Sequence, residues 1–112
     1  MKLPNKITIG GATYSVEQPD IVKGCRGDIN YTQKKIRVAK YTLVIDDIGG
    51  DLAWHSYKDI PAFIRDNTFW HEMTHALLWD MGHKLATNEE FVTRFANRLT
   101  DAIASAQFTE AE

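Results

Sequence analysis

The sequence has one cysteine, no excess of basic charge and no long hydrophobic run, and each absence excludes a class of protein. Because Cys25 is alone, neither an intramolecular disulfide nor a cysteine-based zinc site can form. We expect Cys25 to be a buried or half-buried thiol in a reducing compartment. The formal net charge of the 112 residues is -2, and no block of lysines and arginines is present. The charge pattern therefore gives no indication of nucleic-acid binding.

Segments that would direct the chain to a membrane or bind a nucleotide are also missing. No apolar stretch approaches the roughly 20 residues that cross a bilayer, and residues 1–5 lack the apolar core of a secretory signal. We therefore expect a cytoplasmic protein without a membrane partner. The glycine pairs at 10–11 and 49–50 lack the Lys-Ser/Thr that follows a phosphate-binding loop.

What the sequence does contain is a composition typical of one soluble domain, with strand patterns first and helical patterns second. Hydrophobic residues make up 44% and charged residues 25% of the chain. Alternating apolar residues and turn signals predict a small N-terminal antiparallel sheet within residues 6–48. We expect a loop over 52–60 and a frayed end after Phe108. The predicted strands are 6–9, 12–17, 25–31, 36–39 and 41–45.

The second half predicts two helices, which makes the expected fold class α+β. The first helix spans 61–81: Pro61 suits a first turn, Asp59 is a plausible cap, and Gly82 ends the helix. The second helix spans 88–106. Plotted at 100° per residue, one stripe of the first helix is apolar and is expected to face the core. The residues of that stripe are Phe63, Trp70, Met73, Leu77 and Met81.

The first helix carries the most informative motif of the chain, the H-E-x-x-H pentapeptide His71-Glu72-Met73-Thr74-His75. Two histidines four residues apart project from one helical face, about 40° apart around the axis. That spacing lets His71 and His75 bind one zinc ion, while Glu72 can act as a general base on water. The motif makes a zinc-dependent hydrolase the leading hypothesis. A coincidental H-E-x-x-H in a purely structural helix is the simplest alternative.

A three-ligand zinc site needs one more residue, and two kinds of residue compete for that place. His83 does not fit the H-E-x-x-H-x-x-G-x-x-H pattern, because Leu78 and Met81 occupy its glycine and third histidine positions. We expect His83 to be exposed near the end of the helix. A glutamate at the start of the second helix, Glu89 or Glu90, is the better candidate.

Helical geometry separates these two glutamates. Glu89 lies close to the apolar stripe of the second helix, where a carboxylate is unfavourable unless it is paired or bound to a metal. Glu90 falls on the polar face, with Arg94 four residues later as an ion-pair partner. Thr87 and Glu90 also have the S/T-x-x-E spacing of a capping box. We therefore predict Glu89 as the third ligand and Glu90 as a capping residue. A solvated first-turn acid is the alternative for Glu89.

These residues resemble a known family. The H-E-x-x-H-A helix at 71–76, a turn with Gly82, and Asn-Glu-Glu-Phe-Val at 88–92 are similar to the small zincin-like metallopeptidases of phages and prophages, which are minimal gluzincins related to the ImmA/IrrE family. The similarity covers roughly residues 64–104. It implies a zincin-like domain in which His71, His75 and Glu89 bind Zn²⁺ and Glu72 is the general base.

The resemblance also implies a reaction and its partners. We expect hydrolysis of a peptide or protein by activated water, with the substrate added as a strand beside an edge strand at 36–39. A phage-encoded protein would act in the host cytoplasm. The rival hypothesis is a catalytically silent interaction module that keeps the fold and binds a host or virion protein. A hydrogen-bond donor to the developing oxyanion is also needed, and the candidates are Tyr31, His55, Tyr57 and His83.

Overall fold

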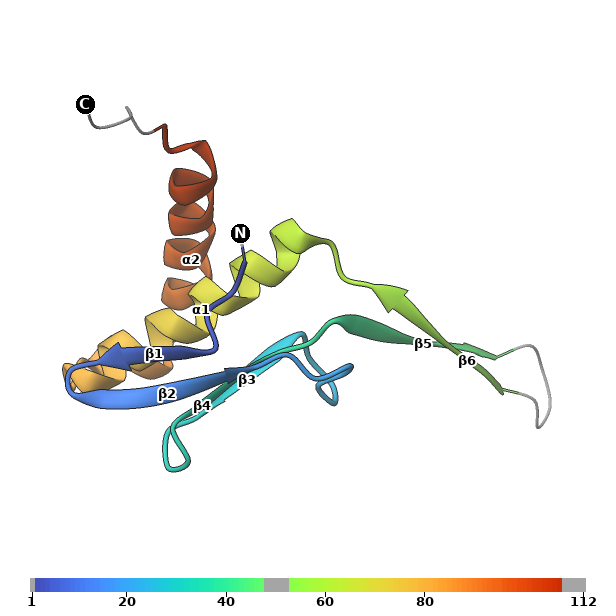
Figure 1. The fold of residues 1–112 in the computed structure, drawn as a ribbon, viewed down its shortest axis with the longest axis horizontal. Helices are drawn as coiled ribbons and strands as arrows, with labels where there is room; N and C mark the ends of the chain where they lie inside the picture. The colour runs from blue at the N-terminus through green and yellow to red at the C-terminus, as the bar shows by residue number, and fades with distance from the viewer. Residues whose placement is uncertain (1, 48–52, 108–112) are drawn as a thin grey trace.

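The computed structural model describes residues 2–47 and 53–107, which form six strands in two sheets followed by two long helices (Figure 1). This α+β arrangement confirms the fold class predicted from the sequence. The elements are β1 (Lys6–Ile9), β2 (Ala12–Glu17), β3 (Gly27–Asn30), β4 (Lys35–Val38), β5 (Tyr41–Asp47), β6 (Ala53–Asp59), α1 (Ala62–Asp80), the 3-10 turn η1 (Lys84–Thr87) and α2 (Glu89–Ser105).

The four-stranded sheet has the order β1-β2-β4-β3, so β3 is an edge strand and β4 is interior. The β1–β2 and β3–β4 hairpins are antiparallel, as predicted, but β2 pairs with β4 in parallel. The sheet is therefore mixed, because the chain crosses over between the two hairpins. Sequence patterns identify the strands of each hairpin, but they do not identify which hairpin edges meet.

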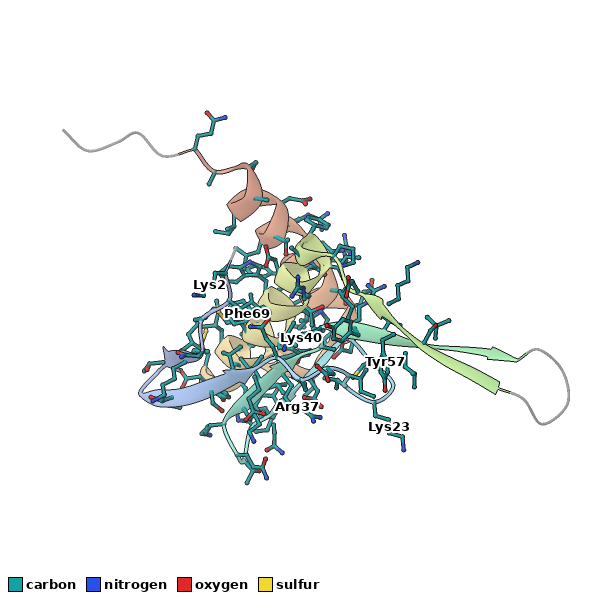
Figure 2. All side chains as sticks on the ribbon, turned by 45° about the vertical axis from the view of Figure 1, so that its right-hand side comes forward. Lys2, Lys23, Arg37, Lys40, Tyr57 and Phe69 are labelled. Atoms are coloured by element: carbon teal, nitrogen blue, oxygen red, sulfur yellow. The ribbon has the colours of Figure 1, made fainter. Side chains whose placement is uncertain are left out.

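The second sheet is the β5–β6 hairpin, which extends away from the rest of the molecule (Figure 1). The prediction of a loop over 52–60 is wrong, because Ala53–Asp59 pairs with β5 from Tyr41↔Asp59 to Asp47↔Ala53. Figure 2 labels Tyr57 on this hairpin, where its side chain is 62% exposed. The sequence of β6 mixes charged and aromatic residues and lacks the alternation of apolar and polar residues that predicts a strand, since most of this strand does not face a core.

Helix α1 lies across the four-stranded sheet, with Phe69 directed between them (Figure 2). It begins one residue after Pro61, and the predicted Asp59 cap is absent because no side chain caps this end. It ends in a Schellman motif, since the N–H groups of Gly82 and His83 donate to Trp79 O and Leu78 O at 3.0 and 2.9 Å. Gly82 has φ +62°, which explains the glycine at this stop.

The buried face of α1 differs from the predicted one. Phe63 and Met81 are 57% and 70% exposed, and Leu77 is also exposed, whereas Trp70 and Met73 are partly buried and pack against the core as predicted. The observed buried residues of α1 are Thr68, Phe69, Glu72, Thr74, His75 and Ala76. The stripe was misplaced because both the sheet and α2 pack against α1, and together they cover the side that carries the motif.

Helix α2 packs on α1 through Val92, Ala96 and Thr100, all of them buried. The predicted capping box is wrong: Thr87 lies in η1, and Asn88 is the N-cap, accepting a hydrogen bond from Phe91 N at 2.9 Å. None of the described helices is long and apolar enough to cross a membrane.

Candidate metal centre

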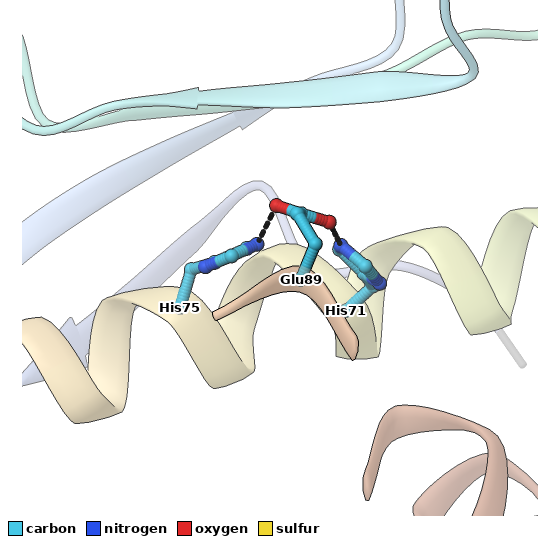
Figure 3. Close-up of side chains that lie close together, drawn as sticks. All are labelled: His71, His75 and Glu89. Atoms are coloured by element: carbon cyan, nitrogen blue, oxygen red, sulfur yellow. Dashed lines mark hydrogen bonds and ion pairs between the residues drawn. The ribbon is translucent and has the colours of Figure 1, made fainter. Parts of the chain in front are cut away.

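His71, His75 and Glu89 meet where the start of α2 crosses α1 (Figure 3). Glu89 Oε1 lies 2.8 Å from His75 Nε2, and Glu89 Oε2 lies 3.1 Å from His71 Nε2. Ligand atoms from the three residues all lie within 4.8 Å of one another. The sequence predicted this grouping, and the structure brings the three side chains together. Their role as metal ligands stays a prediction.

Local structure accounts for each placement. The two histidines are one helical turn apart on α1, so their rings sit side by side with centroids 5.0 Å apart. The turn η1 reverses the chain after Gly82, and the Asn88 cap fixes where α2 begins. Glu89 is the first residue of α2 and reaches back over α1. The α1–α2 crossing is held further along by Asn67, whose amide donates to Thr100 Oγ1 at 3.0 Å.

The ring of His75 has a defined orientation. Its Nδ1 lies 2.5 Å from the carbonyl oxygen of Ala86, and because a carbonyl only accepts, Nδ1 carries the proton. In the neutral ring, the Nε2 lone pair then points at Glu89 Oε1. Two acceptors facing each other at 2.8 Å are repulsive unless a proton or a metal cation lies between them. The geometry at His75 therefore fits a cation held by both groups.

The donor set also fits zinc. Two imidazole nitrogens and one carboxylate oxygen are a known ligand set for catalytic zinc, which leaves a fourth position open. Zinc–ligand bonds of about 2.0–2.2 Å in a tetrahedron keep ligand atoms about 3.3–3.5 Å apart. The two histidine–glutamate pairs, at 2.8 and 3.1 Å, are closer than that, while all the ligand atoms lie within 4.8 Å of one another. Zinc binding would therefore require the carboxylate of Glu89, whose side chain is 71% exposed, to move slightly away from the two rings.

Glu72 lies beside this group and is only 7% exposed. Burial raises the pKa of its carboxyl to about 7, with His75 opposing the shift and the charges of Glu89 and Asp28 adding to it. A carboxylate whose pKa lies near neutrality can accept and return a proton in the physiological range. Burial also lowers the pKa of His71, while the neighbouring Glu89 carboxylate opposes that shift. A neutral imidazole is the form that binds a metal.

Two open cavities flank the ligands along the edge strand β3. One, of about 330 Å³, is lined by Tyr31 and Ile29 together with Glu72 and His75. The other, of about 410 Å³, is lined by Arg26 and Asn67 together with Glu72 and His71. Gly27 and Glu89 line both cavities. The site is therefore an open cleft between β3 on one side and the two helices on the other.

Gly27 explains how close β3 comes to the helix. A Cβ at this position would collide with the side-chain methyl of Thr68 on α1 and would lie 2.7 Å from the carbonyl oxygen of Arg37. Only glycine permits this approach without a shift. The prediction that residues 36–39 form the edge above the site is wrong, because β4 is interior and β3 occupies that place. Sequence reasoning missed Gly27, although a glycine inside a strand signals close approach of another segment.

The remaining residues considered in the sequence analysis are not part of the His-His-Glu cluster. His83 is exposed and its Nδ1 accepts from Leu85 N at 3.1 Å. Glu90 pairs with Arg94 at 3.9 Å, as predicted, and not with the histidines. The thiol of Cys25 is exposed, which contradicts the buried or half-buried thiol expected from the sequence, and it lines the cavity beside His71. The side chain of His55 lies outside the described part of the chain.

The molecule is thus an α+β protein with a His-His-Glu cluster and a buried glutamate beside it. No known family model, no curated protein and no solved structure matches the chain. Its function has to be inferred from the geometry of this site.

Proposed function

We propose that the protein is a small zinc-dependent hydrolase of the zincin type, and that it cleaves peptide bonds. The observation that carries the proposal is the meeting of His71, His75 and Glu89 within 4.8 Å, with the buried Glu72 beside them. Chance matches to H-E-x-x-H do not require a carboxylate from a second helix to reach both imidazoles. The resemblance of the two helices to minimal gluzincins supports the same class.

Each residue then has a role that follows from its position. His71, His75 and Glu89 would hold the ion, and the Ala86 carbonyl keeps His75 in the tautomer whose Nε2 is available to bind it. Zinc in such a site lowers the pKa of a water molecule to near 7 and polarises a carbonyl. Glu72 takes the proton from the attacking water and passes it to the leaving amine, which its pKa of about 7 suits.

A peptide substrate is favoured by the free edge of β3. The N–H of Ala39 donates to the carbonyl of Arg26 at 2.9 Å, so residues 26 and 39 face each other as a hydrogen-bonded pair. Because pairs alternate along an antiparallel ladder, the N–H and C=O groups of Gly27 and Ile29 point away from β4. Both residues line the cleft beside Glu72. An extended peptide can add to this edge as a further strand and cross the ligands.

Zinc content and turnover together test the proposal. The purified protein should bind one zinc ion, and Glu72→Gln should retain that ion while losing cleavage of an unstructured substrate such as casein by about 10²–10⁴-fold. Glu90→Gln, a change of an exposed acid that pairs with Arg94 and lies outside the ligand group, is the matched control and should keep both properties.

The outcomes separate the rival classes. If both the wild type and Glu72→Gln bind zinc and neither cleaves the substrate, the silent interaction module is favoured. Its binding to a host or virion protein should survive the Glu72→Gln change. A protein that takes up no stoichiometric zinc would refute the metal site and leave the motif a coincidence. Cleavage that survives Glu72→Gln would refute the role of Glu72 as the base.

A further inference from the structure

The cleft contains one aromatic hydroxyl whose function the roles above do not explain. Tyr31 follows β3 directly and lines the cavity that also contains Glu72, His75 and Glu89. It is half-buried, and both Glu72 and Glu89 are near enough for their charges to act on its phenol. Tyr31 therefore lines the cleft together with the groups that would carry out the reaction.

Two contacts of Tyr31 and one hydrogen bond within its turn hold it in this place. Its ring stacks on Trp79 of α1, with centroids 4.2 Å apart and planes inclined by 15°. Its carbonyl accepts a hydrogen bond from Lys34 Nζ at 2.9 Å. The side chain of Asn30 closes the turn by accepting from Gln33 N at 2.8 Å. Trp79 lies one turn beyond His75, so the stack ties the phenol to the same helix that carries the two histidines.

The phenol is also in the right chemical state to donate. Burial is the main cause that raises the pKa of Tyr31 above 10, and the charges of Glu72, Tyr14 and Glu89 act in the same direction. The hydroxyl therefore stays protonated at neutral pH and offers one O–H donor. The ring is stacked, so the loss of side-chain freedom that accompanies donation has already occurred on folding.

The other described candidates do not reach the cleft. Tyr57 is 62% exposed on the β5–β6 hairpin, and His83 already accepts from Leu85 N. Neither lines the two cavities beside the ligands. Of these candidates, Tyr31 is the one that lines a cavity together with Glu72.

We propose that the hydroxyl of Tyr31 donates a hydrogen bond to the substrate carbonyl oxygen as the carbonyl carbon becomes tetrahedral and the oxygen becomes negatively charged, and that Trp79 positions this hydroxyl. The inference rests on the proposed function and adds the group that stabilises the oxyanion. Such a donor strengthens as charge develops, so its main effect is on turnover and not on binding of the ground state.

The test uses the zinc-loaded full chain and two probes. An N-phosphoryl dipeptide carries tetrahedral anionic oxygens like those of the intermediate, and the same dipeptide without the phosphoryl group lacks them. Tyr31→Phe should weaken binding of the phosphoryl dipeptide by about 10–100-fold, as expected for loss of a hydrogen bond to a charged acceptor. Binding of the plain dipeptide and zinc stoichiometry should not change. Trp79→Leu should give a smaller loss, because the hydroxyl is present but less well held.

Peptide cleavage provides the second readout. Tyr31→Phe should lower kcat by about 10²–10³-fold with little change in KM. Tyr57→Phe is the matched control and should behave as the wild type. Equal affinity of wild type and Tyr31→Phe for the phosphoryl dipeptide would overturn the role of Tyr31, as would a wild type that binds zinc but not this probe. A wild type that takes up no zinc would instead overturn the proposed function itself.

Discussion

His75 donates its Nδ1 proton to the backbone carbonyl of Ala86 at 2.5 Å, in a buried contact between α1 and the η1 turn. This one bond selects the ring nitrogen that faces Glu89. Since Ala86 belongs to η1 and Glu89 follows two residues after this turn ends, the same short segment orients a histidine and delivers the carboxylate. The geometry of the site therefore depends on the connection between the helices as much as on the motif.

Glu89→Ala should lower zinc affinity by at least about 100-fold, because it removes one of three ligands. Glu90→Ala, the neighbouring change, should leave affinity within about threefold, since Glu90 only pairs with Arg94 on the surface. Competition with a chromophoric chelator measures both. A larger effect from Glu90 would refute the ligand assignment.

His75→Ala should reduce zinc content and melting temperature together. A ligand that binds only the folded state stabilises it by about 2.7 kcal/mol at 100 times its dissociation constant, and this variant loses that stabilisation. His83→Ala is the control: its ring caps η1 by accepting from Leu85 N, so this variant should keep its zinc content, and any loss of melting temperature should not depend on the zinc concentration. Calorimetric melting at several zinc concentrations, with metal analysis of the purified proteins, measures the effect. Unchanged zinc stoichiometry in His75→Ala would contradict the site.

In the metal-free protein, Glu72 should make stability depend on pH. Its pKa is about 7 in the folded state against 4.5 for the model carboxyl, so the folded protein favours the protonated form. The free energy of unfolding should therefore fall as pH rises from about 4.5 to about 7, by on the order of 3 kcal/mol at most. Glu72→Gln should remove most of this slope. Urea unfolding in the presence of a chelator, at pH 5 and pH 8, compares the two proteins.

Gly27→Ala should destabilise the fold by about 1–3 kcal/mol, because its methyl would collide with Thr68 and with the carbonyl of Arg37. Thr68→Ser removes the methyl group of Thr68 but keeps the hydroxyl that donates to Ile64 O at 2.9 Å. The double variant should therefore recover part of the loss, and urea unfolding of the three variants measures it. Recovery to the wild-type value would contradict the clash with Arg37.

The sequence predicted the two helices and the grouping of His71, His75 and Glu89 because these features depend on local periodicity. Helix α1 was expected over 61–81 and spans Ala62–Asp80. The carboxylate was singled out because its angular position on α2 placed it near the apolar face. Such arguments need only the geometry of one helix at a time.

The features that were not predicted depend on how distant segments meet. The edge position of β3 follows from the parallel β2–β4 pairing, which no local pattern encodes. The buried face of α1 was misplaced because apolar side chains such as Phe63 and Met81 remain exposed, while Glu72 and His75 are buried. Polar residues buried at a site contradict the pattern from which a core is inferred.

The way the β5–β6 hairpin joins the rest of the molecule bears on which insertions and replacements the chain can accept. Its two ends are adjacent, since Tyr41 pairs with Asp59 and the N–H of Ile60 donates to Lys40 O at 2.9 Å. The segment between them is therefore closed at its base, like an inserted module. A tight turn that joins residue 40 to residue 60 would leave every described residue of the cleft in place. Beyond Tyr41, whose N–H donates to Asp20 O at 2.8 Å, we therefore expect the hairpin to accept exchange or lengthening while the rest of the protein keeps its architecture.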